Sequence, residues 1–428
     1  SKLLILVTIV GIIAIYLWQQ PAPEPLVRVA LPEAFRDTEA GPVVGFADGK
    51  NTFGWLGIPF AAPPVDELRW AAPRLPEPWQ KNRETVSFKD ACVQLWGPLA
   101  GTTGEVGEVV GNEDCLYLNI WAPQNNSDID STGLPVMFWI HGGGNSIGTA
   151  NTYSGHSLAG GENVVLVTIN YRLGLLGWMS HPALRGEGRS ASDASGNYGN
   201  LDMIAALEWV QKNIASFGGD PDNVTIFGES AGGRNVYSLM ASLPAKGLFH
   251  KAIAQSGSTG TTPLWRAENF ADDKLPGESL SSREWLSLQL QQAGKAEDSE
   301  AAKVAQLLLS DEEILTFMYS RSPKQMLKGI SGGAGMYRAP QSLRDGMVLP
   351  KESLLTLFQS PQRYNDVPLM TGTNRDEAKL FLAQDPEFVG RRFGFLPHIK
   401  DIDIYNSTSA YISDAWKATA VDEVAAVI

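Results

Sequence analysis

Alternation between short apolar runs and a helical pattern constrains the fold of this chain more than any other feature of its sequence. Five runs rich in β-branched residues lie at 134–140, 162–171, 223–228, 251–256 and 367–372. Runs of this length without polar alternation are typical of strands covered on both faces. Between two of them, apolar residues within 201–217 recur at helical spacings and are followed by Gly218, as in an amphipathic helix that ends at glycine. This order predicts an α/β fold with a mostly parallel central sheet and helices on both faces.

Ser230 stands where a strand is expected to turn sharply into a helix. The run 223–228 leads into GESAG at 228–232, and a helical pattern continues after it. A serine at such a turn has a strained backbone, and side chains two positions before and after it would collide unless they are hydrogen atoms. The flanking glycines remove this collision. The arrangement therefore favours a nucleophilic serine over an ordinary turn serine.

Three consecutive glycines, 142–144, follow another predicted strand within the sequence HGGG. Their backbone N–H groups are unshielded and can bind an oxyanion or a phosphate. A phosphate-binding loop would normally add a lysine and a serine or threonine, and no such pair follows Gly144. The loop therefore fits an oxyanion hole that serves Ser230.

Residues 259–365 interrupt the series of strands with sequence that is rich in helix formers and polar on one side. We interpret them as a helical insertion over one end of the sheet, above the active site. No repeat of fixed period is visible. We expect one large α/β domain over residues 41–428, preceded by a segment 1–20 and a linker 21–40.

An apolar stretch occupies residues 3–18, with Lys2 before it and a proline-rich segment after it. As a helix it is a little shorter than the hydrocarbon core of a bilayer, but long enough to span it with local thinning. Two interpretations stay open: a signal anchor, favoured because no A-x-A-like cleavage site follows, and a cleaved signal peptide. Both predict export to the periplasm or the cell exterior. The anchor would provide the only membrane contact.

The charge and the cysteines limit partners and ligands. A formal net charge of −13 without a local basic cluster argues against nucleic acid as a partner. Cys92 and Cys115 are the only cysteines. In an exported chain they are free to form a disulfide, with two buried free thiols as the alternative. Neither has the spacing of a metal site, so no metal is expected.

Several longer motifs resemble the type-B carboxylesterases, a cholinesterase-like group of the α/β-hydrolase fold. They include EDCLYLNIWAP at 113–123, the HGGG loop, INYRLGLLGW at 169–178, the block that ends in GESAGG at 228–233, and GTNRDEA at 372–378. The resemblance runs from about Gly41 to the end of the chain. It implies a serine carboxylesterase that hydrolyses small-molecule esters without a cofactor.

The resemblance implies roles for individual residues. Ser230 corresponds to the nucleophile, and Gly143, Gly144 and Ala231 correspond to the backbone donors of the oxyanion hole. In this chemistry the serine attacks the ester carbonyl, a histidine takes its proton, and water later hydrolyses the acyl-enzyme.

Glu377, within GTNRDEA, corresponds to the acid of the catalytic triad. The chemistry of the sequence alone does not select it among 47 acidic residues. The family usually has glycine where this chain has Ala378. Ser256 resembles a serine that lies close to the acid, and an ordinary serine at the end of a strand is the alternative.

The resemblance also implies three scaffold pairs without a catalytic role. These are a disulfide between Cys92 and Cys115 and the salt bridges Arg69–Glu113 and Arg172–Asp202.

The catalytic histidine has no candidate in this sequence. In the family it usually follows the acid by roughly a hundred residues in an HG turn, whereas this chain ends 51 residues after Glu377 and none of its five histidines has that context. His398 follows the acid too early and is interpreted as structural. We therefore expect the domain to be incomplete at its C-terminus and its general base to lie beyond residue 428.

Two other interpretations compete with an esterase. A non-catalytic, cholinesterase-like adhesion or recognition module would share the fold, but such relatives typically lose the serine or part of the oxyanion hole, and here both are present. A pseudoenzyme that lacks the histidine would also share the fold. The ester substrate and the oligomeric state cannot be derived from the sequence.

Overall fold

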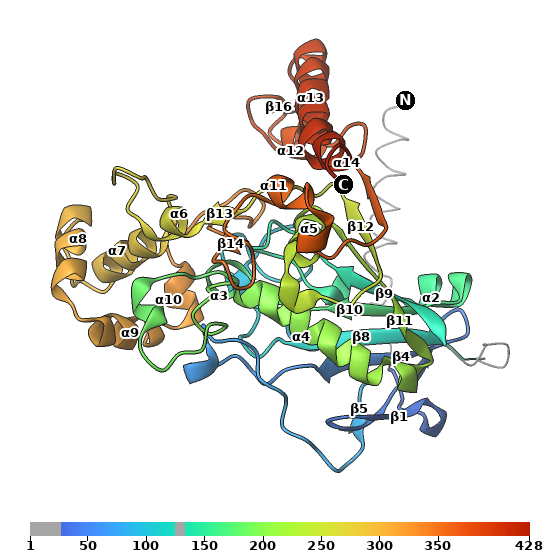
Figure 1. Ribbon diagram of the computed structural model, residues 1–428. Helices are drawn as coiled ribbons and strands as arrows, with labels where there is room; N and C mark the ends of the chain where they lie inside the picture. Colours follow the sequence, from blue (N-terminus) through green and yellow to red (C-terminus); the bar gives the residue numbers. More distant parts are fainter. Residues whose placement is uncertain (1–26, 125–132) are drawn as a thin grey trace.

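The computed structural model describes residues 27–124 and 133–428, and its centre is an eight-stranded mixed sheet (Figure 1). In spatial order the strands are β15 (Leu369–Gly372), β12 (Lys251–Gln255), β11 (Gly219–Glu229), β9 (Leu134–Ile140), β10 (Val165–Ile169), β8 (Tyr117–Pro123), β4 (Thr52–Pro59) and β3 (Phe46–Asp48). Neighbours from β15 to β10 pair in parallel, whereas β10, β8, β4 and β3 pair antiparallel in turn. The predicted α/β fold is confirmed, and all five predicted runs contain strands.

Helices cover both faces of this sheet. Helix α4 (Tyr198–Asn213) and helix α5 (Ala231–Ala241) pack in the main core with Ile120 of β8, whereas Ala159 of helix α2 (His156–Glu162) packs with Trp121. Because successive side chains of a strand point to opposite faces, α2 lies on the other face from α4 and α5. The predicted amphipathic helix is α4 followed by a 3₁₀ turn, and it ends at Gly218 with φ +84°, a left-handed conformation that glycine adopts without strain.

The helical insertion predicted for 259–365 is present. It contains α6 (Leu264–Glu268), α7 (Ser282–Gln292), α8 (Ser299–Leu308), α9 (Asp311–Tyr319), α10 (Pro323–Leu327) and α11 (Leu354–Phe358). Five of these helices, α7 to α11, begin at a serine or aspartate whose side chain accepts a backbone N–H of the first turn, which is the preferred N-cap chemistry. Helices α7 to α10 lie to one side of the sheet (Figure 1) and form a second hydrophobic cluster around Trp70 and Trp285.

The structured domain begins earlier than residue 41, where its boundary was predicted. Strand β1 (Phe35–Thr38) pairs with β2 (Gly41–Val44). Ala34 is fully buried, and its carbonyl accepts a hydrogen bond of 2.8 Å from the Trp55 indole. The part of the predicted linker after about residue 31 is therefore part of the fold. The predicted apolar segment 3–18 lies outside the described residues, and no helix within 27–124 and 133–428 is long and apolar enough to cross a membrane.

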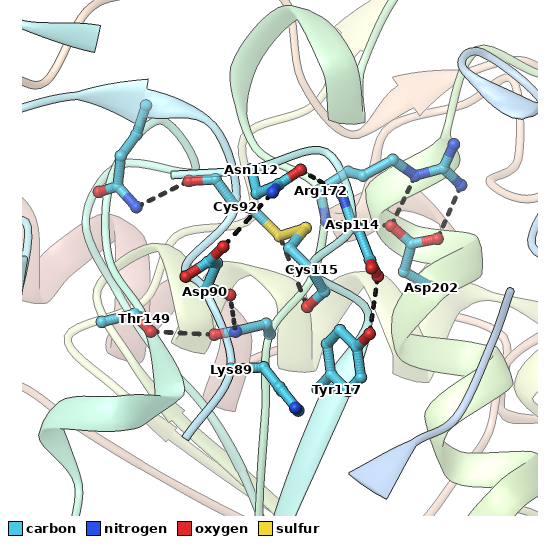
Figure 2. Close-up of a disulfide and its surroundings, with 12 residues drawn as sticks. Lys89, Asp90, Cys92, Asn112, Asp114, Cys115, Tyr117, Thr149, Arg172 and Asp202 are labelled. Atoms are coloured by element: carbon cyan, nitrogen blue, oxygen red, sulfur yellow. Dashed lines mark hydrogen bonds and ion pairs between the residues drawn. A yellow bond between two sulfur atoms is a disulfide. The ribbon is translucent and has the colours of Figure 1, made fainter. Parts of the chain in front are cut away.

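The predicted disulfide between Cys92 and Cys115 is confirmed (Figure 2). It fixes the loop before β8, and both cysteines are buried in the main core. Figure 2 also shows Tyr117, whose hydroxyl donates to Asp114 over 2.8 Å, and the nearby pair Arg172–Asp202. The covalent link thus closes the chain beside one of the buried ion pairs.

Removing this link is expected to lower the free energy of unfolding by about 3 kcal/mol, because the sequence separation of 23 residues sets the loop entropy that oxidation removes from the unfolded chain. Urea denaturation with and without a reductant measures the effect. A variant with both Cys92→Ala and Cys115→Ala is the control, since reductant should leave its stability unchanged. Two free thiols in the native, unreduced protein would contradict the prediction.

Candidate active site

Four loops at the carboxyl ends of neighbouring parallel strands meet at one edge of the sheet. The glycine loop follows β9, Ser230 follows β11, Ser256 follows β12, and Glu377 lies in the turn after β15. These strands are adjacent in the order β15-β12-β11-β9. The fold therefore brings together residues that are up to 235 positions apart in sequence (from Gly142 to Glu377), and this edge is where ligands bind in open α/β sheets.

Ser230 has the strained backbone that the sequence predicts. Its φ is +57° and its ψ is −116°, a combination that a non-glycine residue adopts only when its surroundings enforce it. A Cβ atom added to Gly228 would lie 2.6 Å from the carbonyl carbon of Gly232, and one added to Gly232 would lie 2.0 Å from the carbonyl oxygen of Ile140. Only glycine fits at both positions, so GESAG is a structural requirement of this turn.

The turn holds Ser230 while leaving its hydroxyl available. The Ser230 N–H donates to the carbonyl of Gln255 over 2.8 Å, and its carbonyl accepts the N–H of Arg234 over 3.0 Å. Among the residues that the structure describes, its hydroxyl has no hydrogen-bond partner, and the side chain is partly exposed. The backbone is therefore fixed and the oxygen is free to react.

The glycine loop lies against this turn and carries free backbone donors. A Cβ atom added to Gly142 would lie 3.2 Å from Cβ of Ser230. Gly143 has φ +95° and Gly144 has φ +65°. Within the described part of the chain, the N–H groups of Gly143, Gly144 and Ala231 donate to no protein acceptor. Ala231 is also the first residue of α5, where the helix dipole favours negative charge.

A polar network that the sequence did not reveal supports the glycine loop. Asn145 has a left-handed backbone with φ +56° and exchanges side-chain hydrogen bonds of 3.1 and 2.8 Å with Asn235 of α5. It also donates to Gln341 and accepts from the Tyr171 hydroxyl. After glycine, asparagine is among the residue types that best tolerate this conformation. In the sequence, the asparagine directly after three glycines was the only feature that could have indicated this network.

Glu377 is held by the loop after β12 and by its own turn. Ser256, which is buried and has φ +50°, donates its hydroxyl proton to Oε1 of Glu377. The same oxygen accepts the backbone N–H of Asn374 over 2.8 Å and its side-chain amide over 3.1 Å. The structure thus places Ser256 beside the predicted acid. Partial burial raises the pKa of Glu229, and the negative charge of Glu377 raises it further.

None of the five histidines hydrogen-bonds to Ser230 or Glu377 in the described residues. His141 is buried, its Nδ1 lies 2.9 Å from the Gly142 carbonyl oxygen, and its ring stacks on Tyr171 at 4.5 Å. Burial lowers its pKa to about 4, so the ring is neutral at neutral pH and supports the glycine loop. The other four are His156 on α2, His181 before a 3₁₀ turn, His250 before β12 and His398 on β17 (Leu396–Ile399).

Two buried histidines make stability depend on pH. Burial, followed by the charge of Arg283, lowers the pKa of His181 from 6.5 to about 4, and burial alone lowers that of His141 to a similar value. Between pH 6.5 and 4 the unfolded chain therefore binds more protons than the folded one. Above about pH 6.5 these two histidines do not lower the free energy of unfolding. As the solution is acidified, the free energy of unfolding falls, and at pH 5 each histidine has lowered it by about 2 kcal/mol relative to neutral pH.

His181→Asn separates the two contributions. Its Oδ1 can replace the His181 Nδ1 that accepts the Ala183 N–H over 3.1 Å, and it does not titrate. Urea midpoints at pH 7 and pH 5 should differ less in this variant than in the wild type. An equal difference in both proteins would show that His181 does not contribute.

Both predicted salt bridges are formed at sites away from Ser230. Arg69 makes two hydrogen bonds of 2.6 Å to the carboxylate of Glu113. Arg172 binds Asp202 through contacts of 2.7 and 2.8 Å, with exposed side-chain fractions of 3% and 0%. These pairs link loops and helices of the scaffold and touch none of the proposed catalytic groups.

Comparisons with known proteins agree with this geometry. A model of the Carboxylesterase family matches residues 32–423. "Liver carboxylesterase 1" from Oryctolagus cuniculus is 37% identical over 84% of this chain and 60% of its own length, and "Fumonisin B1 esterase" from Sphingopyxis macrogoltabida is 36% identical over 83% and 58%. A solved structure named "PNB esterase" is 31% identical with a TM-score of 0.63, covering 90% of this chain and 71% of its own. The chain spans about 60% of the length of the curated relatives it matches.

Proposed function

The chain belongs to the carboxylesterase family, and on that premise we propose that the protein is a serine hydrolase of carboxylic esters that works through an acyl-enzyme. The observation that carries the proposal is the strained Ser230 against the glycine loop. In the part of the chain that the structure describes, the Ser230 hydroxyl has no hydrogen-bond partner, and the N–H groups of Gly143 and Gly144 have no acceptor. This arrangement places a nucleophile next to hydrogen-bond donors, as attack on a carbonyl requires, and packing alone does not explain it.

In this mechanism the Ser230 oxygen attacks the ester carbonyl while its proton passes to a general base. The N–H groups of Gly143, Gly144 and Ala231 stabilise the oxyanion, and each donor contributes about 3 kcal/mol to lowering the barrier. Glu377, held by Ser256, is the proposed acid that orients the base. Collapse of the tetrahedral intermediate expels the alcohol, and water then releases the acid. We assign the base to none of the five histidines.

A non-catalytic recognition module is not supported. Such a module needs neither a strained serine nor free amide donors, and this chain has both. The relatives reported above are also named as esterases.

Pre-steady-state kinetics of the whole protein, with substrate in excess, test the proposal. With p-nitrophenyl acetate, an acyl-enzyme mechanism predicts a burst of nitrophenol that approaches one equivalent per active site, provided that deacylation is slower than acylation. Linear hydrolysis without any covalent acetyl group on the quenched protein would contradict the mechanism.

We also propose that the protein is exported and anchored to a membrane by residues 3–18. The disulfide supports an oxidising compartment, and the apolar sequence of that segment supports the anchor. Export alone places the enzyme in the periplasm or outside the cell. Extraction of the enzyme from membranes by detergent, but not by salt or carbonate, tests the anchor. Release by salt would contradict it.

A further inference from the structure

A cleft beside the glycine loop is lined by more positively charged than negatively charged side chains. The cleft has a volume of about 350 Å³, and its lining includes Gly144, Arg234, Arg266, Arg338 and Glu278. This volume is at the lower end of the range for small-molecule sites. Three cations and one carboxylate gather here on a chain whose formal net charge is −13.

Only one of the three arginines is neutralised. Nε of Arg266 lies 3.3 Å from Glu278. Within residues 27–124 and 133–428, neither Arg234 nor Arg338 has a carboxylate within salt-bridge distance. The lining therefore has an excess of two positive charges.

Arg234 is partly desolvated and, among the described residues, has no anionic partner. It lies in the first turn of α5, where its N–H bonds to the Ser230 carbonyl, and its Nε is buried without a hydrogen-bond partner in the described part of the chain. Burial lowers the pKa of Arg234, the charge of Arg338 lowers it further, and Glu278 acts in the opposite direction. The Arg234 side chain is partly exposed and lines the cleft. A partly desolvated guanidinium without an anion is unfavourable, so such a group in a cleft indicates a negatively charged ligand.

We propose that this cleft binds a carboxylate of the substrate, so that the preferred esters carry a free carboxylate besides the ester group. Arg234 binds the carboxylate through its planar guanidinium, which matches two coplanar oxygens. The exposed Arg338 adds long-range attraction at the rim. The inference rests on the proposed esterase function and deepens it, because Gly144 belongs both to this cleft and to the proposed oxyanion hole.

Matched pairs of esters test the inference and show on which side of the ester the carboxylate lies. In the first pair, mono-p-nitrophenyl glutarate carries a carboxylate on its acyl group, and p-nitrophenyl pentanoate is its neutral counterpart. In the second pair, 4-acetoxybenzoate carries the carboxylate on its alcohol part, and 4-methylphenyl acetate is its neutral counterpart. For the wild type we expect a higher kcat/KM for the charged member of one pair. In Arg234→Gln the ratio of charged to neutral kcat/KM should fall about 10- to 100-fold.

Two further variants keep the test independent of folding defects. Arg338→Gln, at an exposed position, should lower the same ratio about 3-fold at low salt and less at high salt. Arg363→Gln is the control, because this arginine pairs with Glu352 on the surface and does not line the cleft. It should leave the ratio unchanged.

Binding of glutarate, followed by calorimetry, tests the site without turnover, and it should be weaker in Arg234→Gln. Hydrolysis of all four esters with no charge preference, together with equal glutarate binding in both proteins, would overturn this inference and leave the esterase intact. Absence of hydrolysis in the wild type, with Arg234-dependent glutarate binding, would instead contradict the esterase and keep the carboxylate site.

Discussion

Replacing Ser230 by alanine should lower kcat/KM for a simple ester such as p-nitrophenyl acetate by about 10⁴-fold or more. In the proposed mechanism the substitution removes the oxygen that forms the acyl-enzyme, and in serine hydrolases the remaining oxyanion donors retain only a small part of the acceleration. The alanine fits the same turn, because the strain at φ +57° belongs to the backbone and is enforced by contacts of Gly228 and Gly232. Initial rates of the whole protein measure the effect.

The control for this substitution is Ser407→Ala. Ser407 is exposed on α13 (Ile402–Lys417), and its loss should leave the rate within experimental error. Thermal unfolding of both variants should match that of the wild type, which separates loss of chemistry from loss of folding. If Ser230→Ala kept a tenth or more of the wild-type rate, Ser230 would not be the nucleophile.

Asp202→Asn should lower the free energy of unfolding by about 3–5 kcal/mol, the largest effect that we expect for a residue outside the active site. Asp202 is fully buried and accepts the backbone N–H and two side-chain groups of Arg172. Removing its charge leaves the buried Arg172 guanidinium uncompensated, which is far less favourable than losing an exposed ion pair. Urea denaturation at pH 7 measures the loss.

An exposed ion pair is the matched control. Lys212 lies 3.2 Å from Glu39, with exposed side-chain fractions of 48% and 58%, and Lys212→Gln should change stability by less than about 1 kcal/mol. Replacing both Arg172 and Asp202 by apolar residues should recover part of the loss, because no unpaired charge then remains. An effect of Asp202→Asn no larger than that of Lys212→Gln would show that the pair is not a buried anchor of the fold.

The strands and the serine turn could be predicted from sequence because their signals are local. A fully covered strand needs a continuous apolar run, and 134–140 coincides with β9 residue for residue. The turn at Ser230 needs glycine on both sides because the neighbouring backbones are within contact distance. Such constraints act on a few adjacent positions, so they leave a readable pattern.

The supports of the site left no such pattern. Ser256 holds Glu377 from another loop, and Asn374 holds it from three positions away in the same turn. A single hydroxyl or amide looks the same in sequence whether it points to solvent or to a carboxylate. Asn145 and Asn235 are 90 positions apart, and only the fold brings them together. The role of Glu377 was implied by the family resemblance and not by its own chemistry.

The domain boundary and the arginine cleft were missed for the same reason. Ala34 is part of the core because Trp55 reaches its carbonyl, and nothing in the sequence around residue 34 marks it as buried. Arg234 and Arg338 come from a helix and a distant loop, and neither belongs to a basic run. The excess of positive charge exists only in three dimensions.

The central claim is that Ser230 is an activated nucleophile, and mapping the adduct of a fluorophosphonate on the native, whole protein tests it most directly. Mass spectrometry of the digested protein should find one phosphonylated residue, Ser230, with no adduct after heat denaturation and none in Ser230→Ala. Absence of labelling in the native wild type, or an adduct on another residue that persists in Ser230→Ala, would contradict the claim.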